Sequence, residues 1–207
     1  LAEAQDLFTR TLEMDNNHVR ARLNRCSAAL LQEELSLALD DANFLVENRP
    51  NLNLARLRRS EILMNLGDWV EANSELRRLL SKSPEYTMAL VHIGTCMNAM
   101  GRAEQAEKPL NKAIQIDPTL SDAWYQRGLL YLDFGRLNEA FSDFESAAKC
   151  NPRHLDAKLR IAAILHEGED PEKSVLAWRE VLNIDPENRL ARRRLEESRG
   201  KTTHQKI

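Results

Sequence analysis

The sequence contains little that would support metal binding, redox chemistry or a membrane span. Its three cysteines, Cys26, Cys96 and Cys150, show no CxxC or zinc-type spacing, so we expect buried free thiols. The five histidines are scattered without the spacing of metal ligands. No apolar run approaches the roughly 18 residues that cross a bilayer. We therefore expect no cofactor, no metal site and no direct membrane insertion, and the free thiols favour a cytoplasmic location.

Composition and motifs also exclude several classes of function. The net charge is −3, so the chain lacks the basic field that recruits nucleic acid, and we expect no nucleic-acid partner. Phosphate-binding Gly-rich loops, GxSxG and HExxH are all missing, which predicts a protein that is not an enzyme. His166 and Glu167 are the nearest candidates for acid–base chemistry. Neighbours on a helix point in different directions, so we interpret them as a polar helix end.

A constant interval of 34 residues organises the chain. Five of the seven prolines are spaced by this interval, namely Pro50, Pro84, Pro118, Pro152 and Pro186. Gly67, Gly101 and Gly135 repeat at the same interval, each where a first helix must end and a tight turn begin. A period of this length indicates a solenoid, in which each unit buries its apolar face only by stacking on its neighbours.

Each period contains two predicted helices. Within residues 121–154, apolar and small residues recur at helical spacing on two successive segments, and Pro152 ends the second one. No segment alternates in the manner of a strand. The two helical faces are formed by Trp124, Gly128 and Tyr131 and then by Ala140, Phe144 and Ala147.

The pattern Trp124-x2-Arg127-Gly128-x2-Tyr131…Ala140-x3-Phe144-x2-Ala147…Pro152 closely resembles the tetratricopeptide repeat. The resemblance implies an all-α solenoid, a right-handed superhelix of helix-turn-helix repeats. We expect a disordered tail at the very end of the chain. The predicted parts are the second helix of an incomplete repeat (1–18), repeats at 19–52, 53–86, 87–120, 121–154 and 155–188, a C-terminal capping helix (189–199) and the tail (200–207).

Several residues depart from the family's pattern. Arginines replace large apolar residues in the first two repeats. We expect either that these first helices pack less tightly or that the arginine stems lie along the surface with the charged heads in water. Glu33 stands where glycine is usual, and Pro109 falls inside a second helix that it should kink. The arginines are Arg22, Arg25, Arg56 and Arg59.

The resemblance also places a candidate binding groove. If the units stack as in the family, the first helices line a concave surface, and two rows of residues point into it. One row is apolar and the other can donate hydrogen bonds, which together suit a bound peptide. The rows are Leu23, Leu57, Val91, Tyr125 and Leu159, and Asn24, Arg58, His92, Gln126 and Arg160. Alternatively, the apolar row only packs against the next repeat.

These features predict a non-catalytic scaffold or adaptor that binds a protein or peptide partner in the groove. The clamp that grips chaperone tails in some family members needs a Lys where this chain has Leu23 and an Asn where it has Ser27. Exposed charge predicts a ligand that is acidic near the first repeat, at Arg20, and basic near the last, at Asp122 and Asp156.

Two further interpretations stay open. The chain starts inside a helix, which we interpret as a fragment: a recruiting or oligomerising arm of a larger enzyme or of a membrane or secretion assembly. Self-association would then use the exposed N-terminal half-repeat, where Leu7 and Phe8 lack a partner helix. The basic run 189–194 is either a solvated capping helix or a signal for nuclear import or for an acidic partner.

Overall fold

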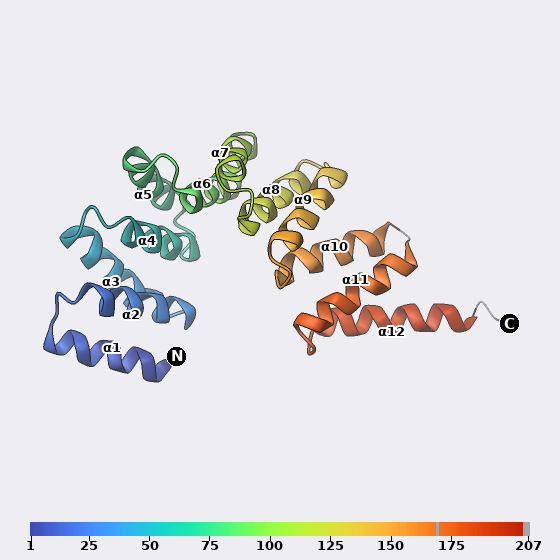
Figure 1. Cartoon of the computed structure of the whole chain (residues 1–207), viewed down its shortest axis with the longest axis horizontal. Coiled ribbons are helices and arrows are strands. Elements are labelled where there is room, and N and C mark those ends of the chain that lie inside the picture. Colours follow the sequence, from blue (N-terminus) through green and yellow to red (C-terminus); the bar gives the residue numbers. More distant parts are fainter. Residues whose placement is uncertain (169, 205–207) are drawn as a thin grey trace. The chain divides into compact units, whose positions relative to one another are not determined.

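A computed structural model describes the backbone of residues 1–168 and 170–204 and the side chains of these ranges up to residue 198. Every regular element in this part of the chain is an α-helix, which confirms the all-α prediction. The twelve helices drawn in Figure 1 are α1 (Ala2–Met14), α2 (Val19–Leu31), α3 (Leu35–Asn48), α4 (Asn53–Asn65), α5 (Trp69–Lys82), α6 (Thr87–Ala99), α7 (Ala103–Ile116), α8 (Ser121–Asp133), α9 (Leu137–Cys150), α10 (Leu155–Glu167), α11 (Pro171–Ile184) and α12 (Arg189–His204).

The helices follow the 34-residue interval closely. From α2 to α11, each first helix has 13 residues and each second helix has 14. The periodic prolines lie shortly after the second helices, which they cannot extend because proline has no N–H and its ring clashes with the preceding turn. The helices form two compact units, Leu1–Pro109 and Leu110–Ile207.

The tight turn inside a repeat requires a left-handed residue. Gly67, Gly101 and Gly135 have φ values of 80°, 72° and 70°, a region that glycine enters without cost. Glu33 occupies the equivalent position with φ of 60°. A side chain in this conformation costs about 1–2 kcal/mol, because Cβ approaches the carbonyl oxygen that follows it.

Small residues let the two helices of a repeat approach closely, as their spacing predicts. Ala72 and Ala140 are completely buried in their second helices, and Cys26 and Ala162 are completely buried in their first helices. The closest approach is at Gly128, where an added Cβ would lie 2.7 Å from Cε1 of the Phe144 ring.

The arginines of the first repeats are not hydrated at their heads, so that prediction is wrong. Asp41 is fully buried between α2 and α3, and it accepts from Arg22 Nη1 at 2.8 Å. Arg25 donates to both carboxylate oxygens of Asp41, with Nε and Nη2 each at 2.8 Å, and these hydrogen bonds raise the pKa of Arg25. The charges tolerate burial because each has a partner of opposite sign and further hydrogen bonds.

The same arrangement recurs in the second and fourth repeats. Buried Glu75 binds Arg56 Nη1 at 2.7 Å and Arg59 Nη1 at 3.0 Å. Buried Asp143 receives two hydrogen bonds from Arg127, each of 2.7 Å, in a bidentate pair. Asp41, Glu75 and Asp143 occupy one repeat position, because 41 + 34 = 75 and 75 + 68 = 143.

These arginines also join neighbouring repeats. Arg59 Nε donates to Asn43 of the preceding second helix at 2.7 Å, and Arg127 Nη1 donates to Asn111 at 2.7 Å. The two acceptors are themselves 68 residues apart and hold the same repeat position. Each cluster therefore stabilises the packing within one repeat and the junction with the repeat before it.

The third repeat lacks this cluster. Leu90 and Ile93 replace the two arginines, and Pro109 takes the position of the buried acid. α7 continues through Pro109 from Ala103 to Ile116, so the proline does not end the helix. The division between the two compact units falls directly after Pro109.

The last helix is longer than the capping helix predicted over 189–199. α12 runs from Arg189 to His204, so it includes the start of the predicted tail, while residues 205–207 lie outside the described part of the chain. Ala191 and Leu195 pack into a core with the buried Trp178. Arg193 and Arg194 both bind Glu197 within α12. This arrangement favours the capping interpretation of the basic run.

Two of the three cysteines are buried, as predicted. Burial raises the pKa of Cys26 to about 12 and that of Cys96 to about 11, because a thiolate loses hydration in an apolar core. The prediction is wrong for Cys150, which is exposed. It is the last residue of α9, where its thiol donates to the Pro118 carbonyl at 3.4 Å.

Candidate partner-binding face

The first helices of the Leu1–Pro109 unit present the face on which the groove was predicted. α2 and α4 contact each other, as do α4 and α6. Leu57 is only 4% exposed and Val91 only 2%, whereas Leu23 is half-buried. Neighbouring helices therefore cover the middle of the apolar row. Leu57 and Val91 therefore pack against the neighbouring repeats, as the alternative interpretation of this row expects, and neither side chain is available to a ligand.

The polar row of this unit forms a charged cluster. Asn24 is exposed, and Arg58 Nη1 binds Glu61 Oε2 at 2.6 Å. His92 Nε2, on the next first helix, lies 4.0 Å from Glu61 Oε1. Glu61 is thus held between α4 and α6 by groups that the sequence predicted to face a ligand. Arg58 keeps a side chain that is one-third exposed, so its remaining N–H groups can donate outward.

In the Leu110–Ile207 unit, the face is built around an aromatic pair. The Tyr125 ring lies 4.8 Å from the ring of His154 and 5.7 Å from that of Phe144. His154 caps α10, since its Nδ1 accepts the N–H of Ala157 at 3.3 Å. The proton of the neutral imidazole is then on Nε2, which lies 3.6 Å from Asp122 Oδ1.

The other predicted residues of this unit are accessible. Gln126 and Leu159 are half-buried and Arg160 is exposed. Arg160 is one turn along α10 from Asp156, which is also exposed. The eight predicted residues that a ligand could reach are Leu23, Asn24, Arg58, His92, Tyr125, Gln126, Leu159 and Arg160.

Comparison with known proteins decides the family. Two family models, both described as tetratricopeptide repeat, match residues 63–130 and 121–154. A solved thermophilic tetratricopeptide-repeat protein of Thermus thermophilus shares 17% identity and superposes with a TM-score of 0.76, over 87% of this chain and 98% of that one. The chain belongs to the tetratricopeptide-repeat family.

Other tetratricopeptide-repeat arrays superpose over most of the chain. A structure of the APC/C heterotetramer Cut9–Hcn1 matches with a TM-score of 0.80 and 16% identity, over 95% of this chain and 39% of that one. YrrB, described as having an unusual peptide-binding site, matches with a TM-score of 0.55 and 21% identity, over 89% of this chain and 95% of that one. At these identities the likeness establishes the fold.

The relatives in sequence match this chain over only part of their own length. Human DnaJ homolog subfamily C member 3 is 22% identical over 91% of this chain and 40% of its own length. Human protein O-mannosyl-transferase TMTC3 is 27% identical over 56% of this chain and 12% of its own length. A tetratricopeptide-repeat protein of Rhizobium etli is 32% identical over 40% of each chain. The chain therefore spans well under half of each of these relatives.

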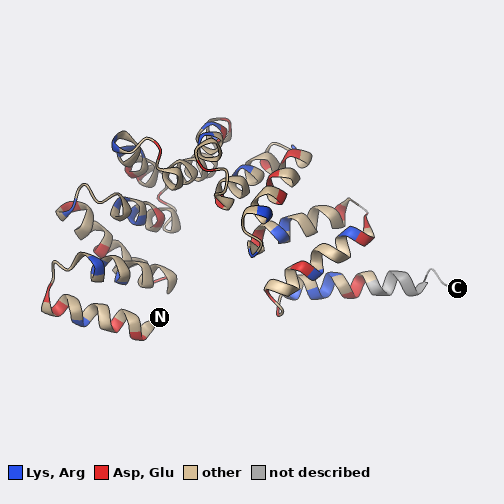
Figure 2. Cartoon of the chain, viewed as in Figure 1, with Lys and Arg blue, Asp and Glu red and all other residues tan. Residues whose placement is uncertain are grey.

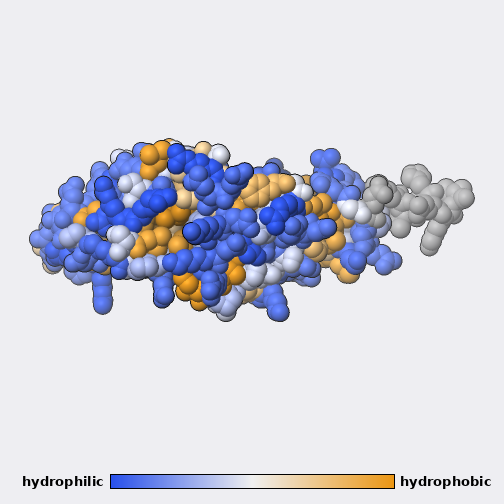
Figure 3. Space-filling view, turned by 90° about the horizontal axis from the view of Figure 1, so that it is seen from above, coloured by the Kyte–Doolittle hydropathy of each residue, from blue (hydrophilic) through white to orange (hydrophobic). Residues whose placement is uncertain are grey.

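The surface of this tetratricopeptide-repeat chain is mainly hydrophilic, with separate apolar patches in the face shown in Figure 3. Lys and Arg are concentrated on α4 and at the start of α12 (Figure 2). Among the described residues, no group of His, Cys, Asp and Glu side chains is arranged to hold a metal ion. Of the helices described, none combines the length and apolar character that a membrane span needs.

Sequence reasoning missed two kinds of site residue. Glu61 and His154 organise the face, yet neither belongs to the two predicted rows. His154 follows Pro152 by two residues, where a helix cap is expected.

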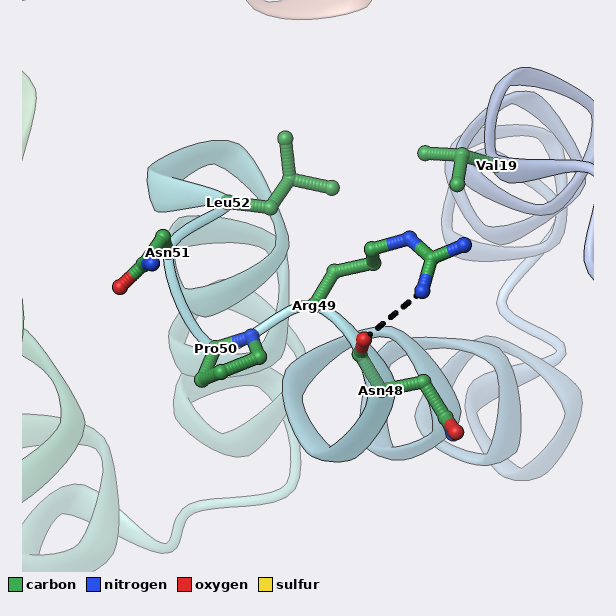
Figure 4. A pocket seen from close by; sticks show the side chains of 6 residues that line it. All are labelled: Val19, Asn48, Arg49, Pro50, Asn51 and Leu52. Carbon is green, nitrogen blue, oxygen red and sulfur yellow. Dashed lines mark hydrogen bonds between the residues drawn. The ribbon is translucent and has the colours of Figure 1, made fainter.

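Sequence reasoning also missed hollows at two equivalent loops between repeats. One is lined by Val19, Pro50 and Leu52, and Arg49 lies at it while donating to the Asn48 carbonyl at 3.0 Å (Figure 4). The other is lined by residues 83–86.

In the candidate acid–base pair His166 and Glu167, the histidine has a structural role. His166 Nδ1 lies 3.4 Å from the hydroxyl of Ser174, which is 2% exposed on the facing helix α11. Glu167 is exposed at the end of α10. This geometry supports the interpretation of a polar helix end.

Proposed function

We propose that this chain is a non-catalytic protein-interaction scaffold that binds a peptide or helix of a partner protein on the faces of its first helices. The observation that carries the proposal is the row of donors at one repeat position, from exposed Asn24 through half-buried Arg58 and Gln126 to exposed Arg160. Such donors can bind backbone carbonyls of an extended segment, whatever its side chains. The structural likeness to YrrB, whose description names a peptide-binding site, supports the proposal.

The charge of each unit indicates what it would bind. The first-helix face of Leu110–Ile207 carries Asp122, whose side chain is 52% exposed, and exposed Asp156. The face of Leu1–Pro109 carries exposed Arg20 beside the Arg58–Glu61–His92 cluster. We propose that the second unit binds a basic portion of the partner and the first unit an acidic portion, since charge of one sign steers and selects its complement.

The proposal predicts a loss of affinity when the exposed donors are removed. Asn24→Ala combined with Arg160→Ala should weaken partner binding about tenfold or more. A tenfold loss corresponds to about 1.4 kcal/mol, which is within the range measured for the loss of hydrogen bonds to charged groups. The partner is first isolated by affinity capture and mass spectrometry, and its binding peptide is then titrated by fluorescence anisotropy. Leu57 and Val91 are unsuitable for this test, because truncating buried side chains would destabilise the fold.

The matched control is Asn138→Ala combined with Arg179→Ala, which removes the same residue types from exposed positions on second helices. This control should bind as the wild type does. Equal affinities for the two double variants would contradict a binding role of the first-helix faces.

A second candidate function is that of a self-associating arm of a larger protein. The chain aligns with only 12% of O-mannosyl-transferase TMTC3, so arrays like it occur inside larger enzymes. α1 exposes Leu7 by 61% and Met14 by 91%, two residues on one helix face. This candidate predicts concentration-dependent dimers in sedimentation equilibrium that Leu7→Ser with Met14→Ser abolishes, while Leu137→Ser with Leu176→Ser does not. A strict monomer at every concentration would rule it out.

A further inference from the structure

We propose a second docking surface in the Leu1–Pro109 unit, distinct from the first-helix face, that binds a protein segment in which Lys or Arg side chains accompany apolar ones. The surface consists of the two tight turns at 31–35 and 66–70 and is called the turn edge below. It goes beyond the function proposed above, because it uses none of the residues on the first-helix rows.

The turn edge contains a strained residue at a position that glycine fills in the next three repeats. Glu33 has φ of 60°, where Gly67, Gly101 and Gly135 have φ of 70° to 80° at the equivalent positions. Glycine would give the same turn without strain. The Glu33 side chain is exposed, and no ion pair or side-chain hydrogen bond joins it to the described residues. Folding therefore gains nothing from this carboxylate, and strain at an exposed position points to a role in binding.

Large apolar side chains are exposed on the same two turns. Leu31 is 70% exposed, Leu66 is 50% exposed and Val70 is 71% exposed. α2 and α4 contact each other and run in the same direction, separated in sequence by the antiparallel α3, so the turns that follow them lie at the same edge of the unit (Figure 1). A single exposed apolar residue is ordinary, whereas three at adjoining turns indicate a contact surface.

The charge of the turn edge selects the partner. Glu33, Glu34 and Asp68 are exposed acids, and residues 31–35 and 66–70 contain no Lys or Arg. Asp68 also caps α5 by accepting the N–H of Glu71 at 3.3 Å, which leaves its negative charge in place. The equivalent turn of the next repeat carries exposed Arg102, so the acidic surface ends there. Nucleic acid and anionic lipid would be repelled, and a basic segment with apolar side chains is the complement.

The test measures binding of a fluorescent synthetic peptide composed of Lys and Leu, with a Glu and Leu peptide as its counterpart. The chain should bind the first peptide in a manner that depends on Glu33, whereas binding of the second peptide at the first-helix face, near Arg20, should not depend on Glu33. Glu33→Gln and Glu33→Gly should each weaken binding severalfold, consistent with one exposed ion pair. Leu31→Ser combined with Val70→Ser should weaken it about tenfold or more, because the apolar contacts are lost.

Two controls separate the turn edge from charge in general and from the first-helix face. Glu47→Gln removes the same charge from the opposite end of α3 and should bind as the wild type does. All of these titrations are made in an Asp122→Asn, Asp156→Asn background, so that the acids proposed above to bind a basic segment on the first-helix face do not contribute to the signal. A failure of the first-helix proposal then leaves the outcome of this test unaffected. Thermal melting should show that Glu33→Gly is more stable than the wild type while it binds less well.

Several results would overturn the proposal. These are no binding of the Lys and Leu peptide, an equal loss of binding of the Glu and Leu peptide in the Glu33→Gln variant, or a Glu33→Gln variant that binds the Lys and Leu peptide as well as Glu47→Gln does. A Glu33→Gly variant that gains stability with full binding would likewise show that the strained carboxylate serves no partner.

Discussion

Glu75→Ala is expected to lower the free energy of unfolding by about 3–5 kcal/mol, the usual result of removing one partner from a buried ion cluster. Glu75 is 1% exposed and binds Arg56 and Arg59, whose side chains are 13% and 19% exposed. Alanine would leave Arg56 partly desolvated without a counter-ion, and it would leave Arg59 with only the part-exposed carboxylate of Glu71. The measurement is urea denaturation followed by circular dichroism, with hydrogen exchange to locate the loss in α4 and α5.

The matched control removes the whole cluster. Arg56→Leu, Arg59→Ile and Glu75→Ala together reproduce the apolar first-helix pair Leu90 and Ile93 of the third repeat, with an alanine at the acid position as in Ala177. This triple variant should recover most of the stability that Glu75→Ala loses, because apolar replacements of a buried ion cluster are often neutral or stabilising. A Glu75→Ala variant within about 1 kcal/mol of the wild type would show that water reaches the arginines.

The helical architecture could be predicted because it depends on local chemistry repeated at a fixed interval. Proline after the second helices of the five full repeats and a left-handed residue in the tight turns of the first four are set by neighbouring backbone sterics alone. The small residues Gly128 and Ala140 are likewise buried where their spacing placed them. Each of these signals lies within one repeat, so it can be recognised in the sequence without knowing which helix packs against it.

The buried charges could not be predicted in the same way, because their stability depends on a partner in another helix. Arg25 resembles an exposed residue until Asp41, 16 residues later, is placed against it. A usable signal did exist in the sequence. Acids stand at one repeat position in the first, second and fourth repeats, which are the repeats with an arginine at the Arg25 position, and both features are missing from the third.

The burial of two members of the predicted apolar row could not be read from the sequence, for a related reason. Helical spacing places Leu57 and Val91 one residue past the packing face, but the spacing does not say how closely α2, α4 and α6 approach each other. The contacts between these helices bury both side chains, whereas Tyr125 and Leu159 stay half-exposed. The remaining residues of both rows stay a prediction of where a ligand binds.

Gly128→Leu is expected to destabilise the chain by about 2–3 kcal/mol, even though leucine favours a helix over glycine by about 1 kcal/mol. The first added carbon already lies 2.7 Å from Cε1 and 2.9 Å from Cδ1 of Phe144, whose side chain is fully buried and packs against Tyr125. The ring would have to leave its site or the two helices would have to separate. Chemical denaturation measures the loss.

A double variant shows whether the conflict with Phe144 is the cause. Phe144→Ala alone should cost about 3–5 kcal/mol through the cavity that it leaves. Adding Gly128→Leu to Phe144→Ala fills that cavity from the facing helix, so the double variant should be more stable than Phe144→Ala alone. If the two losses simply add, the side chains do not share one space, and the close approach of α8 and α9 at Gly128 is not what determines the packing of this repeat.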